Sequence, residues 1–420
     1  MIENRDELLN VPYRFRKRRE IAIKALESAI ISVHPDTVIP EHVKKIGDEI
    51  EISGIPVKKR GKIAVFGMGK ASYHMGIALH RILGDVIDEG VIVSIKEGKV
   101  GNIVFKRGSH PFPDEETLKN TEKILDMAKS LREGDLAIVL ISGGGSSMFC
   151  MPKYGVSLEE IREITESLMK KGADIWELNV VRRSLSMVKG GKFTRYLRPA
   201  KVISLIISDV VDNHLPSIAS GPTVAVKNEE RKAEEILRRY GIWDQVSEGV
   251  KRALKEEIRG ESADMNLIIA DNRMAVSHAS MVLALNGIEH QIYHSVIGSV
   301  EEISKAMVNQ NLSAIMGGES TAKVRGNGRG GRNQELVLRA MKTGSKGLVA
   351  SVGTDGIDGN SPYAGAIADE YTAEISNKKG LDMEEFLKNS DSSSFFERVG
   401  GAIKTGFTGT NVADIILHIV

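Results

Sequence analysis

The sequence lacks several features that define whole classes of proteins. Its 420 residues include a single cysteine, Cys150, which excludes an internal disulfide and favours a reducing compartment. The longest apolar runs, such as residues 202–207, have the length of a strand and are too short to span a bilayer. Residues 1–7 also lack the apolar core of a signal peptide. We therefore expect a soluble cytoplasmic protein with no membrane partner.

The chain has no excess of charge of one sign, with 57 lysines and arginines against 56 acidic residues. This balance disfavours nucleic acid as the main partner. The dense basic segment 14–19 leads into an amphipathic helical pattern, which favours a solvated helix start over a nucleic-acid patch. Glutamine is scarce, with four residues, whereas lysine, glutamate and arginine are plentiful. Because this composition is typical of heat-adapted proteins, we hypothesise a thermophilic origin.

Short apolar runs alternate with amphipathic helical patterns along most of the chain, and this alternation predicts an α/β fold. We expect two α/β domains, the first Rossmann-like with a mostly parallel sheet. The length exceeds that of a usual single core, and a charged segment ends near residue 262, so we place the domains at residues 1–262 and 263–420. The last segment, 408–420, fits either domain. Ligands of open α/β sheets bind where strands end in glycine turns, so we expect the active site in the interdomain cleft.

Glycine-rich polar segments follow nearly every predicted strand. Segment 142–147 has three consecutive glycines flanked by serines, a pattern that can turn successive N–H groups inward as an anion-binding nest. Segment 67–72 runs from a strand into a helix and carries Lys70 where a helix prefers an anion. It is neither a Walker A loop nor a complete dinucleotide fingerprint, because Ser72 replaces the third glycine. Lys70 is interpreted as the partner of an anionic ligand, with a surface lysine beside a tight turn as the alternative.

Two further segments of the first half carry basic side chains. Arg182 lies on a predicted helix, 178–188, and Lys189 lies just after it; seven residues apart, they would share a helix face with Ser186. That face is either a grip for a carboxylate or phosphate, or a solvated surface. His110 lies in a constrained loop and is either an acid–base group or a structural residue.

The second half repeats the combination of glycine and polar residues. Segment 326–335 opens into a helix near Arg332, where converging N–H groups would favour an anion. Segment 353–359 carries Asp355 and Asp358, candidates for a metal ligand or general base over a simple turn. It does not match the EF-hand pattern, because Ala366 stands where the final glutamate would be.

Two carboxylates also follow a predicted strand in the first half, within segment 208–212. Mg²⁺ takes one or two carboxylates together with phosphate oxygens and water, so Asp209 is a candidate ligand. Asp212 fits an Asx turn or a helix cap equally well.

Taken together and in order, these motifs resemble the glycerate 2-kinase family, whose C-terminal part is known as the MOFRL domain. The matching motifs lie at residues 67–71, 110–111, 142–146, 179–191, 208–210, 220–223, 317–319, 330–335, 353–359 and 408–412. Each motif is weakly specific, but the ordered set covers nearly the whole chain. Segment 211–214 departs from the family's more glycine- and acid-rich turn, which leaves the role of Asp212 open.

The resemblance implies phosphorylation of D-glycerate to 2-phosphoglycerate, with ATP as the donor nucleotide and Mg²⁺ as the metal. The expected catalytic residues are Lys70, Arg332, Asp209 and Asp355. The expected substrate and phosphate ligands are Gly67, Gly69, His110, Ser142, Gly143, Gly144, Gly145, Ser146, Ser147, Asn179, Arg182, Lys189, Gly190, Gly331, Asn333 and Asn411. The expected metal ligands are Asp209, Glu319, Asp355 and Asp358.

Two other functions stay open. An NAD(P)-dependent hydroxypyruvate reductase or glycerate dehydrogenase needs an acidic ribose ligand at a strand end, about twenty residues after the glycine turn. Asp85, Asp88 and Glu89 fit this poorly because they precede the strand at 91–95. A non-catalytic phosphometabolite-binding protein would leave the paired acids unused. The phosphorylated hydroxyl, the donor, the metal, the general base and the subunit count, with a homodimer as one candidate, also stay open.

Overall fold

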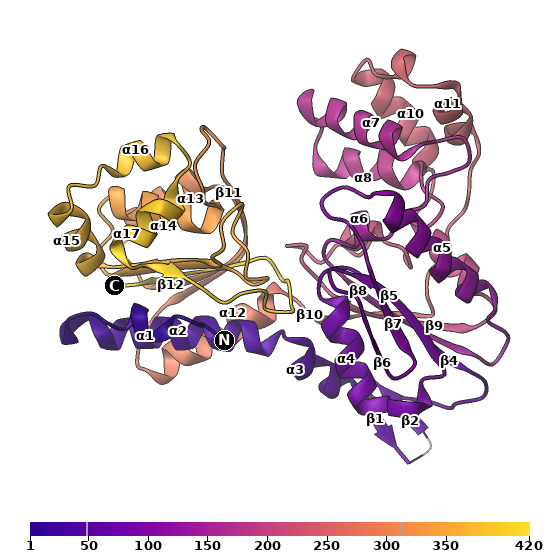
Figure 1. The fold of residues 1–420 in the computed structure, drawn as a ribbon, viewed down its shortest axis with the longest axis horizontal. Helices are drawn as coiled ribbons and strands as arrows, with labels where there is room; N and C mark the ends of the chain where they lie inside the picture. The colour runs from indigo at the N-terminus through magenta and orange to yellow at the C-terminus, as the bar shows by residue number, and fades with distance from the viewer. Residues whose placement is uncertain (48, 311) are drawn as a thin grey trace. The chain divides into compact units, whose positions relative to one another are not determined.

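The computed structural model describes residues 1–47, 49–310 and 312–420. These residues form two compact units (Figure 1). The central unit comprises Val38–Ile269, and the terminal unit combines Met1–Thr37 with Ala270–Val420. This grouping differs from the expected division at residue 262, because the first helices pack with the C-terminal segment and one further strand joins the first sheet.

The central unit is built on a seven-stranded sheet with the order β10-β9-β8-β4-β5-β7-β6. Its strands are β4 (Ile63–Met68), β5 (Glu89–Ser94), β6 (Gly98–Val100), β7 (Ile103–Arg107), β8 (Leu136–Ser142), β9 (Lys201–Ile207) and β10 (Met265–Ala270). Neighbours in the series β7-β5-β4-β8-β9 pair in parallel. This is the 3-2-1-4-5 order of doubly wound sheets, and the order reverses between β4 and β8. β10 was expected to open the second domain, but it lies beside β9.

Helices α4 (Ser72–Leu83) and α5 (Glu115–Lys129) follow strands of this sheet. Asp114 caps α5 by accepting the Thr117 N–H at 2.8 Å, at the helix start that proline and acidic residues predict. A separate helical layer stands above the sheet in Figure 1. It consists of α7 (Leu158–Lys170), α8 (Ile175–Ser184), α10 (Glu229–Arg239) and α11 (Glu248–Lys255), joined to the sheet by the short α6 (Gly145–Met148) and α9 (Lys192–Leu197).

The helical layer has its own apolar core, which includes Leu168, Val181 and Leu237. A buried ion pair reinforces it, since the Arg183 guanidinium donates to both carboxylate oxygens of Glu229 at 2.6 to 2.9 Å. The remaining elements of the central unit are the antiparallel sheet of β1 (Val43–Ile46), β2 (Glu49–Ile52) and β3 (Ile55–Val57), the 3₁₀ turns η1 (Gly84–Val86), η2 (Ile218–Ser220) and η3 (Trp243–Gln245), and α3 (Pro35–His42), which begins in the terminal unit.

The terminal unit has a mixed six-stranded sheet with the order β11-β12-β16-β13-β14-β15. Its strands are β11 (Gln291–Ser299), β12 (Ala314–Thr321), β13 (Leu348–Gly353), β14 (Gly365–Ala368), β15 (Ala402–Ile403) and β16 (Asp414–Ile419). The last strand, β16, lies between β12 and β13 and is antiparallel to both. The C-terminal segment therefore completes this sheet, a placement that the sequence left open.

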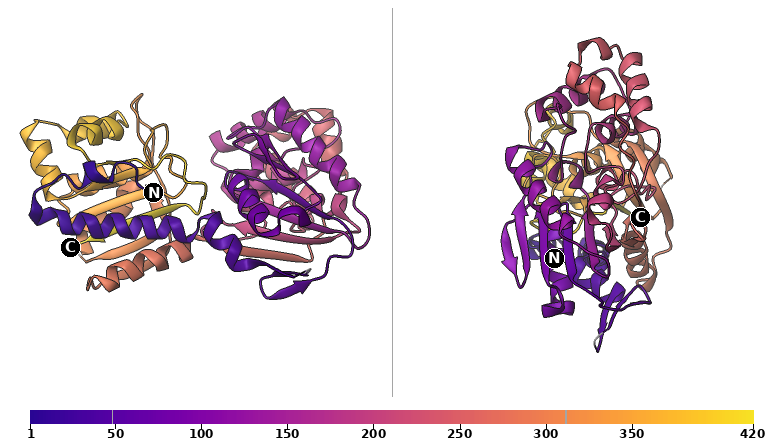
Figure 2. Two further views of the ribbon diagram at one scale, coloured as in Figure 1. Left: turned by 60° about the horizontal axis from the view of Figure 1, so that its bottom comes forward. Right: turned by 90° about the vertical axis from the view of Figure 1, so that its right-hand side faces the viewer.

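Helices cover both faces of the mixed sheet. Figures 1 and 2 show α2 (Tyr13–Ser32) and α12 (Asn272–Leu285) side by side on one face. The other helices of this unit are α1 (Arg5–Leu8), α13 (Val300–Gln310), α14 (Arg332–Lys342), α15 (Glu370–Lys378), α16 (Met383–Lys388) and α17 (Ser392–Val399). Among the helices of the described residues, none has the length and apolarity needed to cross a bilayer.

The basic segment 14–19 has a structural explanation in this unit. Arg19 is buried and donates to both carboxylate oxygens of Asp369, the residue that caps α15, at 2.8 Å. Arg14 and Arg18 form ion pairs with glutamates of the same helix. The segment is thus a docking face for α15 rather than a merely solvated helix start, and it ties the N-terminal helices to the C-terminal part of the chain.

Candidate active site

Two predicted loops meet where the strand order reverses. β4 and β8 end side by side, with Met68 opposite Ile141, and the segments that follow are joined by hydrogen bonds. The Lys70 N–H donates to the Gly143 carbonyl at 2.8 Å, and the Ala71 N–H donates to Ser142 Oγ at 3.0 Å. Ser142 therefore has a structural role, since its hydroxyl holds the lysine loop against the glycine loop.

Lys70 and His110 converge on the glycine loop. Gly144 adopts a φ of +80°, which favours glycine. A Cβ atom at this position would lie 3.2 Å from Cγ of Lys70 and 3.2 Å from Cδ2 of His110. The structure thus brings together three residues that the sequence proposed separately, and the space above Gly144 is occupied by a cationic chain and an imidazole.

A third segment, around Lys189, is hydrogen-bonded to the end of the glycine loop. The Lys189 ammonium donates to the carbonyls of Ser146 and Phe149, the latter at 3.0 Å. Ser146 Oγ lies 2.8 Å from Ser220 Oγ, and the Gly190 N–H donates to the Ser220 carbonyl at 3.0 Å. Burial lowers the pKa of Lys189 to about 8, because a charged ammonium loses hydration in the interior.

The predicted helix carrying Lys189 is shorter than expected. α8 ends at Ser184, so Lys189 does not share a helical face with Arg182. The two side chains nevertheless line one pocket, because the turn after α8 brings Lys189 back under the glycine loop. The predicted common helical face is therefore wrong, but Arg182 and Lys189 do line the same pocket.

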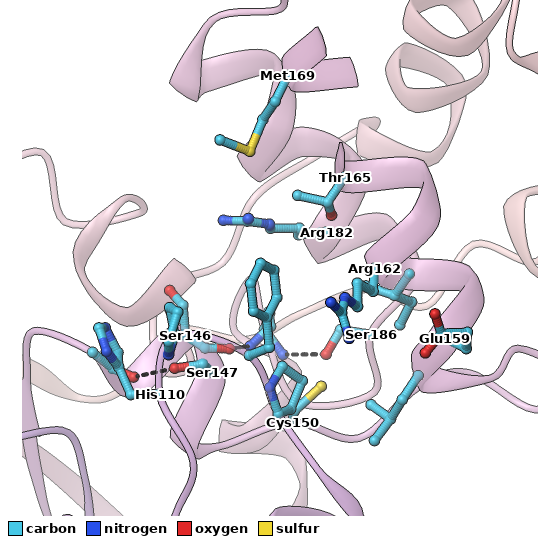
Figure 3. Close-up of a pocket in the computed structure, with 17 residues that line it drawn as sticks. His110, Ser146, Ser147, Cys150, Glu159, Arg162, Thr165, Met169, Arg182 and Ser186 are labelled. Atoms are coloured by element: carbon cyan, nitrogen blue, oxygen red, sulfur yellow. Dashed lines mark hydrogen bonds between the residues drawn. The ribbon is translucent and has the colours of Figure 1, made fainter. Parts of the chain in front are cut away.

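This pocket has a volume of about 400 Å³. Its lining includes His110, Gly144, Ser146, Ser147, Phe112, Cys150, Leu158, Ile161, Arg162, Thr165, Met169, Arg182, Ser186 and Lys189. Figure 3 shows the Arg182 guanidinium pointing into the pocket, with Met169 to one side and Ser146 and Ser147 to the other. Within the described part of the chain Arg182 has no hydrogen-bonding or ion-pair partner, and burial lowers its pKa. A half-buried guanidinium in this setting suits an anionic ligand.

The remaining predicted residues of the central unit are two polar side chains at the site end of the sheet and helix, and two glycines of the first loop. Asp209 follows β9, whose last residue Ile207 pairs with Ser142, so this carboxylate lies at the same end of the sheet as the glycine loop. Asn179 is buried on α8, one turn before Arg182. Gly67 lies within β4, where a Cβ would come 3.0 Å from the Ile92 side chain, and Gly69 packs against Ser142. These two glycines therefore serve packing and the turn.

In the terminal unit, Arg332 is the centre of an ion-pair network. Its guanidinium donates to both oxygens of Asp414 at 2.6 and 3.0 Å and to Glu319 at 2.8 Å. Burial opposes the positive charge, but the carboxylates of Asp414 and Glu319 hold the pKa of Arg332 above its ordinary value. Arg332 is thus held in one orientation by a buried aspartate.

A carboxylate of the protein, that of Asp358, is bound at the N-terminus of α14. The Asp358 carboxylate accepts the N–H groups of Asn333 at 2.9 Å and Gln334 at 2.8 Å. Burial raises the pKa of Asp358 to about 6, although these donors stabilise the charged form. The Asp358 carboxylate thus accepts the N–H groups at this helix start for which the sequence predicted a ligand anion.

The other predicted residues of this unit lie in the same group of loops. Asp355 Oδ1 accepts the Ile357 N–H at 3.1 Å, and Asn411 Oδ1 accepts the Ala413 N–H at 3.3 Å. The Asn333 side chain donates to Asp358 and Asp414. Within the described residues, no three histidine, cysteine, aspartate or glutamate side chains are grouped so that they could hold a metal ion.

Comparison with known proteins accounts for this arrangement. The MOFRL family matches residues 312–414, and a domain of unknown function, DUF4147, matches residues 21–255. The chain is 35% identical to the D-glycerate 2-kinase of Thermotoga maritima over 96% of its length and 98% of that protein. The chain belongs to the glycerate 2-kinase family. A glycerate 2-kinase of Pyrococcus horikoshii is also 35% identical, over 96% of this chain and 97% of that protein.

Solved structures of the glycerate 2-kinase family share the fold. The crystal structure of the Thermotoga maritima glycerate kinase superposes with a TM-score of 0.83 at 35% identity, covering 96% of this chain and 99% of that chain. The family resemblance and the α/β fold class predicted from the sequence are therefore confirmed.

Sequence reasoning missed Asp414, the buried partner of Arg332 in this member of the glycerate 2-kinase family. Asp414 begins β16 and pairs in register with Gly318 on one side and Gly353 on the other. It therefore stands between two of the predicted glycine motifs. The one signal in the sequence is an acid at the head of a mostly apolar strand, two residues after the 408–412 motif.

Proposed function

We propose that this protein is an ATP-dependent glycerate 2-kinase, which transfers a phosphoryl group to the 2-hydroxyl of D-glycerate with the help of Mg²⁺. The observation that carries the proposal is the convergence of Lys70 and His110 on Gly144 where the strand order reverses. Open α/β sheets bind their ligands at such a point. The 35% identity over nearly the full length of a protein named D-glycerate 2-kinase supports the same activity.

In this reaction the glycerate hydroxyl oxygen bonds to the terminal phosphorus of ATP, the bond from that phosphorus to the ADP oxygen breaks, and the hydroxyl proton passes to a base. The protein mainly positions the groups and neutralises their charge. We assign Lys70 the role of neutralising the negative charge on the transferring phosphoryl group. The main chain of residues 143–146 and the Arg182 guanidinium would hold phosphates or the substrate carboxylate.

We assign the role of general base to Asp209. It follows β9 at the end of the sheet where β8 leads into the glycine loop, so it belongs to the same group of loops as Lys70. The alternative base is Asp355, which lies in the terminal unit and accepts the Ile357 N–H. A carboxylate within reach of the hydroxyl is sufficient for this step, because the proton moves as the phosphorus–oxygen bond forms.

The carboxylates fit Mg²⁺ as the metal, because this ion is bound by one or two carboxylates plus phosphate oxygens and water rather than by a full protein cage. Glu319 and Asp355 of the terminal unit are proposed as ligands, while Asp209 keeps the role of base. Asp358 is set aside, since both its oxygens accept N–H groups of α14. When bound, Mg²⁺ would neutralise part of the phosphate charge.

Within the terminal unit, Arg332 is proposed as a cation that binds a phosphate or carboxylate. Asp414 holds the Nε and Nη2 edge of the guanidinium, while Nη1 contacts the exposed Glu319. This arrangement fixes the plane of the guanidinium, and a phosphate or carboxylate that meets its Nη1 side would displace the Glu319 carboxylate.

The test is glycerate-dependent release of ADP by the full chain, with phosphorus NMR of the product to identify the phosphorylated hydroxyl. Absence of glycerate-dependent ADP formation, or a 3-phosphate product, would reject the proposal. Oxidation of NADH with hydroxypyruvate would favour the reductase instead. The structure gives that alternative little support, since Asp88 accepts the Ile63 N–H at 2.7 Å at the start of β4, away from the glycine turn.

A further inference from the structure

The pocket beside the glycine loop has an apolar wall, and none of the roles proposed for phosphoryl transfer involves its residues. Leu158, Ile161 and Met169, together with Thr165, line it from α7, and the charged Glu159 and Arg162 of the same helix also border the pocket. The first four are spaced by three, four and four residues along the chain, which places them on one face of that helix. Phe112 adds an aromatic ring from the loop after His110. The pocket therefore combines a cationic side, with Arg182 and Lys189, and an apolar side along α7.

Two large apolar side chains of this wall are unusually open. Phe112 is 39% exposed and Met169 is 57% exposed. The Phe112 ring is held from one side by Arg162, whose Cζ lies 5.0 Å from the ring centroid, a cation–π distance. Apolar surface that stays exposed inside a pocket, next to a guanidinium with no partner among the described residues, is typical of a ligand site.

The size of the pocket distinguishes between the two substrates. Its volume of about 400 Å³ lies in the range of sites for ligands much larger than a three-carbon acid. Glycerate has no apolar group that an aromatic ring and four α7 side chains could cover. A nucleoside triphosphate has both required parts, because its base is flat and largely apolar on its faces while its tail is anionic.

We propose that the apolar wall holds the base of the phosphoryl donor, with the base packed between the Phe112 ring and Ile161 and with Arg182 facing the phosphate chain. This assignment deepens the proposed kinase function and rests on it. It gives the α7 face the role of recognising the nucleoside, whereas the glycine loop and Lys70 handle the phosphates. Stacking of a base on an aromatic side chain stabilises the bound nucleoside whatever the base, because every base has a π-face.

The test compares two ligands that differ only in the nucleoside: ATP and inorganic tripolyphosphate. Their binding to the full chain is measured by calorimetry without glycerate. Ile161→Trp fills the proposed base site, and Phe112→Ala removes the stacking ring. The matched control is Ile175→Trp, because Ile175 is an exposed isoleucine of the same helical layer that does not line this pocket. Circular dichroism and the urea midpoint verify folding of each variant.

We expect Ile161→Trp and Phe112→Ala each to weaken ATP binding by about tenfold while tripolyphosphate binding and the KM for glycerate stay unchanged. The Ile175→Trp control should match the unsubstituted protein. Unchanged ATP affinity in both folded variants would overturn the proposal. Equal weakening of ATP and tripolyphosphate, or a change confined to the KM for glycerate, would overturn it as well, because the wall would then serve phosphate or glycerate. Failure of the kinase function would appear separately, as absence of glycerate-dependent ADP formation by the unsubstituted protein.

Discussion

Replacing Lys189 with methionine tests the electrostatics of the glycine loop directly. Lys189 is 4% exposed, and its ammonium is held by the Ser146 and Phe149 carbonyls. Burial lowers its pKa from 10.5 to about 8, which corresponds to about 3 kcal/mol of unfavourable free energy while the group is charged. Methionine keeps a similar length without the charge.

The direction in which pH changes the free energy of unfolding follows from proton binding. Between the folded pKa of about 8 and the unfolded value of 10.5, the unfolded chain binds more protons at this site than the folded chain. Stability therefore rises with pH in that window, and the penalty of the buried charge is present in full below pH 8. The unsubstituted protein should thus gain about 2 kcal/mol relative to Lys189→Met between about pH 7.5 and about pH 10.

The assay is urea denaturation of both proteins across this pH range. Taking the difference between the two proteins cancels the titration of groups that do not interact with Lys189, and the loss of the two hydrogen bonds is a constant offset. A difference in unfolding free energy that stays flat with pH would refute the desolvation of Lys189. An independent check uses ATP affinity, which should fall above about pH 8 in the unsubstituted protein as the ammonium loses its proton, and should stay level in Lys189→Met.

Three further substitutions probe the proposed roles. Lys70→Ala should lower turnover by about a hundredfold, the usual loss for one preorganised charge partner; a near-normal rate in a folded variant, measured by coupled ADP release, would contradict its role. Arg182→Gln should raise the KM for ATP or for glycerate by at least about tenfold. The control Arg195→Gln, a change at an exposed arginine, should leave both KM values unchanged. Equal kinetics in the two variants would count against a role of Arg182 in binding. Arg332→Ala leaves the Asp414 carboxylate buried without its partner and should cost about 3 kcal/mol of stability; an unchanged urea midpoint would rule out a structural role for this pair.

Local sequence signals predicted much of the central unit. β4 and β8 are fully buried strands, and their unbroken apolar runs indicated parallel strands covered on both faces. Lys70 and the 142–147 segment each follow such a strand, so their meeting at one end of the sheet follows from the α/β pattern itself. His110 had no such signal, because its approach to Gly144 depends on the path of a loop.

Partners distant in sequence were the source of the errors. The acids of α15 that pair with the basic segment 14–19 lie more than three hundred residues away, and no local pattern connects them. The start of α14 was interpreted as a ligand site because its N–H groups are visible in the sequence as a glycine-rich helix start. The carboxylate that satisfies them, Asp358, comes from another loop.

Residue order and composition were therefore enough for the α/β class, the family and the loops that carry the chemistry, because hydrophobic period and glycine turns are local properties of the chain. The tertiary structure alone decided that β10 extends the first sheet, that β16 lies between β12 and β13, and that Asp414 holds Arg332. Strand neighbours and ion pairs of this kind depend on which surfaces bury one another, and that selection is made only when the whole chain packs.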